Sequence, residues 1–169
     1  MQVRVAAHPD IPEIVRLKGA MMETSYPFPV VVADHPEWPP KASARVRQMM
    51  DLGIHTFFVI DDPEQPDSDG ADAPRLIGSI SVEIQLAIPG IQWKGTSAYI
   101  GDMYVDPRFR GQGLGRMLMD AALGQARAWD AGTARLSSTP GAVDVYLALG
   151  FHFPERDQPE LFPMMWMDL

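Results

Sequence analysis

Alternation of apolar and polar residues over positions 76–88 is the clearest periodic pattern in the chain. Aliphatic side chains occupy one face of this stretch, and the other face carries Ser79, Ser81, Glu83 and Gln85. A period of two is typical of a β-strand with one buried face. Residues 97–105 are mostly apolar, aromatic or small and come after a Pro-Gly turn, which predicts a second strand antiparallel to the first.

A helical period follows directly. Pro107 ends the second strand because it has no N–H to donate to a ladder. Over residues 114–128, apolar side chains then recur at Leu114, Met117, Leu118, Ala121, Ala122 and Ala128. This spacing predicts an amphipathic helix with one face against the sheet.

Shorter patterns predict the other elements. Alternation around Val3 and Val5 predicts a strand, and Asp10 precedes an apolar stripe that indicates a helix. Prolines after Tyr26 and Trp38 interrupt the chain, so the next helix is expected over residues 41–52. The remaining expected elements are strands at 56–60 and 134–138, a helix of about two turns around Tyr146, and closing strands at 151–153 and 162–166.

Composition limits the domain count. The chain has 169 residues and 46% hydrophobic content, which is enough for one core, so we expect a single domain over residues 1–169.

Residues 61–74 are acidic and rich in proline, and apart from proline they include no apolar residue larger than Ala. This composition predicts a mobile loop over residues 61–75.

Charge and cysteine content narrow the function classes. The net charge of −8 argues against a nucleic-acid-binding surface and favours cationic substrates. The chain has no Cys, which excludes disulfides, thiolate metal sites and cysteine nucleophiles, and we expect no metal site. Because no stretch resembles a signal peptide or approaches the ~20 apolar residues of a membrane helix, we expect a cytoplasmic protein with no membrane partner.

The turn before the 114–128 helix is rich in glycine. Gly111, Gly113 and Gly115 allow the backbone to approach a ligand closely, and the first amides of a helix lack partners inside it. Such amides can bind an anion, and Arg110 and Arg116 add positive charge beside them. The spacing alone fits equally a tight turn that needs glycine only for its backbone conformation.

Two nucleotide-binding motifs are excluded at this turn. A P-loop needs Lys followed by Ser or Thr, and Arg116 and Met117 stand there instead. A dinucleotide-binding fingerprint needs an acidic residue at the end of the next strand, and the strand expected at 134–138 has none.

Two motifs together resemble the GNAT superfamily of acyl-CoA-dependent N-acetyltransferases. The first is Arg110-x-x-Gly113-x-Gly115 directly after a strand, which is similar to the family's pyrophosphate loop. The second is Ala142-x-x-x-Tyr146-x-x-x-Gly150-Phe151, which is similar to its short helix beside CoA. The resemblance implies a mixed α/β (α+β) fold, with a mostly antiparallel sheet of about six to seven strands, about four flanking helices, and a splay at the strand ending near Val105.

The resemblance implies acetyl-CoA as cosubstrate and a set of residues that bind it. By position, these cofactor-binding residues are Met103, Tyr104, Val105, Arg110, Gly111, Gln112, Gly113, Leu114, Gly115, Arg116, Thr139 and Ala142. Many relatives have Asn where this chain has Thr139, and a threonine side chain reaches less far toward the cofactor.

Catalytic and substrate-binding roles also follow from the resemblance. Tyr146 matches the family tyrosine that protonates the sulfur of CoA. Acyl transfer to an amine also needs a base, for which Asp102 is the first candidate, Glu83 the second and water a third. The region between the first two strands borders the acceptor cleft in the family, which makes substrate-binding candidates of Tyr26, Phe28, His35 and Trp38.

The expected activity is transfer of an acetyl group from acetyl-CoA to a primary amine by direct attack in a ternary complex. The acceptor partner is a small molecule or a peptide, and a homodimer is left open. The alternative is an acyl-CoA-binding sensor or structural module without turnover. The presence of both Tyr146 and Asp102 favours the enzyme.

Overall fold

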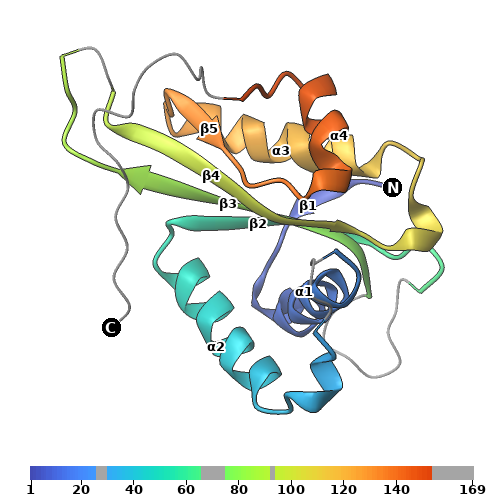
Figure 1. Cartoon of the computed structure of the whole chain (residues 1–169). Coiled ribbons are helices and arrows are strands. Elements are labelled where there is room, and N and C mark those ends of the chain that lie inside the picture. Colours follow the sequence, from blue (N-terminus) through green and yellow to red (C-terminus); the bar gives the residue numbers. More distant parts are fainter. Residues whose placement is uncertain (26–29, 66–74, 92–93, 154–169) are drawn as a thin grey trace. The chain divides into compact units, whose positions relative to one another are not determined.

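A mixed sheet organises the N-terminal part of the chain (Figure 1). The computed structural model describes residues 1–25, 30–65, 75–91 and 94–153, and the chain divides into two compact units, residues 1–137 and 138–169. In the first unit the strands lie in the order β1 (Val3–Val5), β2 (His55–Asp61), β3 (Leu76–Leu86), β4 (Thr96–Val105) and β5 (Thr133–Arg135). Neighbouring strands are antiparallel except for β4 and β5, which are parallel.

The mixed, mostly antiparallel character of the sheet is therefore confirmed, whereas the expected strand count is wrong. The described residues form five strands rather than six to seven. Residues 151–153 form no strand, and the closing strand expected at 162–166 lies outside the described residues. β5 is also shorter than the strand expected at 134–138.

Helices cover both faces of this sheet (Figure 1). α1 (Ile11–Ser25) and α2 (Trp38–Asp51) lie on one face, and α3 (Leu114–Ala128) lies on the other. α4 (Val143–Ala148) belongs to the second unit. Short 3-10 turns complete the described elements: η1 (His8–Asp10), η2 (Val32–Asp34), η3 (Pro107–Phe109) and η4 (Pro140–Ala142). None of the helices in the described residues combines the length and apolarity that crossing a membrane requires.

α2 begins earlier than its prolines suggested. Pro39 and Pro40 occupy the first turn of the helix, where the missing N–H groups would have no intrahelical partner in any case. The helix therefore starts at Trp38 instead of residue 41, and this brings Trp38 onto the helix surface.

β3 separates two unlike faces, as its alternation predicted. On one face Ile80 and Val82 are fully buried. On the other face Ser79 and Ser81 are also buried, although they are polar. They lie opposite Val59 and Phe57 of β2, which belong to the core formed with α1 and α2. The polar face of β3 therefore lies beneath helices rather than in solvent.

The loop expected to be mobile is described only at its ends. Asp62 is buried, its amide donates to the carbonyl of Arg75 at 2.7 Å, and its carboxylate accepts from the amide of Glu64 at 2.9 Å. Residues 66–74 lie outside the described residues. The mobility of this loop and the single domain over residues 1–169 stay predictions.

An ion cluster around the buried carboxylate of Asp10 links the start of α1 to the sheet. The Arg4 guanidinium donates to both carboxylate oxygens of Asp10 at 2.7 Å and to Asp61 at 2.6 Å. Asp10 is almost fully buried and also accepts from the amide of Ala7. Burial raises the pKa of Asp10, but the hydrogen bonds from Arg4 and Ala7 outweigh it and hold that pKa below its usual value.

We expect Arg4→Ala to lower the free energy of unfolding by about 3 kcal/mol, because it leaves the Asp10 charge buried without its cation. Arg47→Ala is the matched control. Arg47 is exposed on α2 and should change stability by less than about 0.5 kcal/mol. Urea unfolding of the two variants measures the difference, and equal stabilities would show that the cluster contributes nothing.

Candidate active site

A bulge in β4 forms the centre of the candidate site. Ser79 pairs with Tyr104 and Ser81 with Gly101, so one residue of β3 faces two of β4, Asp102 and Met103. Asp102 adopts a left-handed backbone with φ of 52°. Asp is among the few residue types that tolerate this conformation, and the extra residue turns the strand locally.

β4 also parts from its other neighbour. It pairs with β5 only over Ser97, Ala98 and Tyr99. Beyond Tyr99, the β5 side of β4 has no strand partner among the described residues, so the two strands separate well before Val105. Met103, Tyr104 and Val105, the expected binding residues of this strand, therefore lie where the sheet has opened. The carbonyl of Val105 accepts from Nε of Arg110 at 3.0 Å.

The glycine-rich turn presents free amides at the start of α3. Gly111 and Gly113 have φ of 77° and 79°, which explains glycine at both positions. Gly115 needs no such conformation, and a Cβ there would meet no described atom within 4 Å. The amides of residues 111–116, which include Gln112 and Leu114, have no hydrogen-bond partner in the described part of the chain. The turn therefore fits an anion held close to the backbone.

The two arginines beside this turn differ in their contacts. Arg110 turns back toward the strand, where its guanidinium lies 5.6 Å from the centre of the Tyr104 ring. Arg116 points outward with 70% of its side chain exposed, and its Nε lies 3.7 Å from Asp120. The side chain of Leu114 is buried in the core, so only its backbone is free for a ligand.

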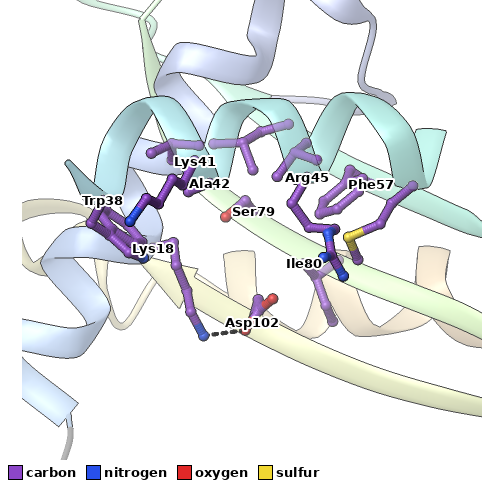
Figure 2. Close-up of a pocket in the computed structure, with 13 residues that line it drawn as sticks. Lys18, Trp38, Lys41, Ala42, Arg45, Phe57, Ser79, Ile80 and Asp102 are labelled. Carbon is purple, nitrogen blue, oxygen red and sulfur yellow. Dashed lines mark hydrogen bonds and ion pairs between the residues drawn. The ribbon is translucent and has the colours of Figure 1, made fainter. Parts of the chain in front are cut away.

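A pocket of about 390 Å³ lies between the α1–α2 face and the bulge of β4 (Figure 2). α1 and α2 supply most of its lining, β2 and β3 supply Phe57, Ser79 and Ile80, and β4 supplies Asp102. Nζ of Lys18 on α1 lies 2.5 Å from a carboxylate oxygen of Asp102, as the dashed line in Figure 2 shows. The bulge thus directs the carboxylate of Asp102 into a cavity of substrate size.

The four substrate-binding candidates differ in their position relative to the pocket. Trp38 lines the pocket from the first turn of α2. His35 is not among the lining residues, and its ring lies 3.7 Å from Glu37 at the surface. Tyr26 and Phe28 lie outside the described residues.

His55 is a site residue that the sequence did not single out. It lies opposite Glu83 in the β2–β3 register, with its Nε2 3.6 Å from the Glu83 carboxylate. Its Nδ1 is buried without a hydrogen-bond partner among the described residues. Burial lowers the pKa of His55 below its usual value, although the charges of Glu83 and Asp102 oppose the shift. The pairing of His55 with Glu83 follows from the register between β2 and β3, which no local sequence pattern indicates.

The second unit holds Tyr146 in a capped helix. The amide of Phe151 donates to the carbonyl of Tyr146 and that of Gly150 to Leu147, both at 3.0 Å, and Gly150 has φ of 93°. This is a Schellman cap, and its usual apolar contact is formed by the rings of Tyr146 and Phe151, 6.0 Å apart. Burial raises the pKa of Tyr146 above its usual value, so the phenol stays protonated at neutral pH.

The other expected cofactor residues of this unit lie before α4. Thr139 precedes the turn η4, and its carbonyl accepts from the amide of Ala142 at 3.0 Å. Its hydroxyl forms no capping hydrogen bond. The side chain of Thr139 is therefore not committed to the helix.

Comparison with known proteins identifies the fold and the family. The acetyltransferase (GNAT) family matches residues 23–151. A predicted acetyltransferase with acetyl-CoA from Clostridium acetobutylicum has a similar structure, with a TM-score of 0.74, 16% identity, and coverage of 99% of this chain and 94% of that one.

Two curated relatives match over shorter stretches. An uncharacterized N-acetyltransferase from Gracilaria tenuistipitata var. liui is 44% identical over 55 residues, which cover 32% of this chain and 30% of that protein. A probable acetyltransferase from Glycine max is 30% identical over 103 residues, which cover 61% and 37%. The matches thus span about a third of the length of each relative. The family match covers most of the chain, and the chain belongs to the GNAT acetyltransferase family.

Proposed function

We propose that the protein is an N-acetyltransferase that moves an acetyl group from acetyl-CoA to a primary amine of a small molecule or peptide. The observation that carries this proposal is the continuity of β4, the glycine-rich turn and α3. An opened strand leads directly into a row of free amides, beside a pocket into which Asp102 projects. Acetyl-CoA has a thioester arm and a diphosphate, so it needs an extended backbone edge, an anion site and a neighbouring cavity for the acceptor.

Acetyl-CoA supplies the acetyl group as a thioester, and the residues of the chain supply the proton transfers. The amine must lose a proton to become a nucleophile, and Asp102, which lines the pocket, is the proposed base. Glu83 is the second candidate. It lies beside His55, but it ranks after Asp102 because it does not line the pocket. Tyr146, protonated at neutral pH, is the proposed proton donor to the departing sulfur. The backbone of residues 103–105 is proposed to polarise the acetyl carbonyl.

Gly115→Val is expected to weaken acetyl-CoA binding by at least about tenfold. Its added side chain would enter open space, so the melting temperature should change by no more than about 2 °C. Arg116→Ala removes an exposed charge and should weaken binding less than about fivefold. Calorimetric titration with acetyl-CoA tests both variants, and unchanged affinity in Gly115→Val would exclude close approach of the ligand to this turn.

Tyr146→Phe should lower kcat by about 10- to 1000-fold and leave acetyl-CoA affinity near its original value, because the hydroxyl acts in the transition state while the ring keeps its packing. Tyr99→Phe is the matched control, since its hydroxyl lies 3.4 Å from Ser137 and is assigned no role in the reaction. Thiol release with a panel of amines gives the rates. Normal turnover in Tyr146→Phe would refute the acid role, and tight acetyl-CoA binding without turnover by the parent protein would favour a sensor.

Asp102→Asn tests the base. Asn also tolerates a left-handed backbone, so the bulge should survive the change. We expect the rise of kcat/KM on the acid side of its pH profile to flatten in this variant and to persist in Glu83→Gln. The reverse pattern would assign the base to Glu83. Persistence of the rise in both variants would point to ionisation of the acceptor amine itself.

A further inference from the structure

The charge of the acceptor pocket is opposite to that of the whole chain. Its described lining holds three cationic side chains, Lys18, Lys41 and Arg45, and a single carboxylate, Asp102. Lys18 is neutralised by Asp102 at 2.5 Å. Lys41 and Arg45 form no ion pair with any residue that the structure describes. Two uncompensated positive charges therefore line this cavity in a chain whose net charge is −8.

The spacing of these two cations places them on the pocket side of α2. Lys41 and Arg45 are four residues apart, so they share one helix face, and the same face presents Trp38, Ala42, Val46 and Met49 to the pocket. Figure 2 shows Arg45 reaching from α2 toward the strands beneath it. Two like charges at this spacing destabilise a helix slightly, and the only acidic residue of α2, Asp51, lies at the far end and pairs with His8.

The guanidinium of Arg45 and the ammonium of Lys41 are groups that bind anions. A guanidinium presents paired donors that match a carboxylate or a phosphate, and a neighbouring ammonium adds a point charge. Trp38, Phe57 and Met49 supply apolar walls to the same pocket. An acceptor with a cationic tail would meet repulsion from Lys41 and Arg45, although the acidic net charge of the chain taken alone favours cationic substrates.

We propose that the acceptor is an amine that also carries a carboxylate or phosphate group, with Lys41 and Arg45 binding this anion and Asp102 facing the amine. This inference rests on the acetyltransferase function proposed above and specifies its substrate class. Lys41 and Arg45 act as specificity-determining residues in this arrangement.

Matched probes that differ only in the anionic group test the proposal. Phenylalanine and phenylalaninamide differ in a carboxylate, 2-aminoethyl phosphate and ethanolamine differ in a phosphate, and spermidine represents cationic acceptors. Ligand-observed NMR titration measures binding of each probe without any need for turnover, and thiol release in the presence of acetyl-CoA measures kcat/KM. A preference for the first or the second anionic probe distinguishes a carboxylate from a phosphate.

We expect at least one anionic probe to bind about 10- to 100-fold more tightly than its partner without the anionic group, a factor typical of hydrogen bonds to a charged group. Arg45→Gln and Lys41→Gln should each reduce this preference, chiefly through a higher KM for the probe that carries the anionic group. Arg47→Gln is the control, because Arg47 is an exposed residue of α2 that does not line the pocket.

Three results would overturn the proposal: binding of no anionic probe, equal preference in wild type and in the Lys41→Gln, Arg45→Gln double variant, or faster turnover of spermidine than of both anionic probes. In the last case the acetyltransferase function itself would stand. Selective binding of an anionic probe without thiol release from any acceptor would support the anion site and contradict the acetyltransferase function instead.

Discussion

The left-handed turn of the backbone at Asp102 is the constraint on which the candidate site depends. A regular strand would continue its alternation to Val105 without a shift in its register with β3. The extra residue in β4 breaks the register with β3 and turns the Asp102 carboxylate toward α1, where Lys18 meets it. Pairing with β5 has already ended at Tyr99. One short stretch of strand therefore has an edge without a strand partner on one side and lines the pocket through Asp102 on the other.

Burial of polar groups distinguishes the pocket side of the sheet. Ser79 and Ser81 are buried under α1 and α2, and the partly buried His55 lies beside Glu83. A stability-optimised sheet would place aliphatic residues at such positions, because buried polar groups need hydrogen-bond partners. Of these three residues Ser79 lines the pocket, which fits a surface where polar groups are retained at a cost in packing.

The features that could be predicted from the sequence are those that depend on local hydrophobic periodicity or on the conformational freedom of glycine. The alternation of residues 76–88, the helix beginning at Leu114 and the left-handed glycines of the turn all rest on neighbours along the chain. Features that need register or tertiary cover were not predictable: the meeting of His55 with Glu83, the ion pair of Lys18 with Asp102, and the helices above the serines of β3. The start of α2 was missed for a local reason, since prolines in a first helical turn look in sequence like a helix interruption.

The opened edge of β4 has a consequence for association between molecules. An unpaired strand edge is a template on which the strand of another chain can assemble, and this leads toward edge-to-edge aggregation. Between Ile100 and Val105 the described residues offer such an edge, but the bulge at Asp102 and Met103 lies within it and disturbs the regular spacing of donors and acceptors. An incoming strand could not keep its register across this interruption. The irregularity that aims a carboxylate into the pocket thereby also makes this unpaired edge a poor template for polymerisation.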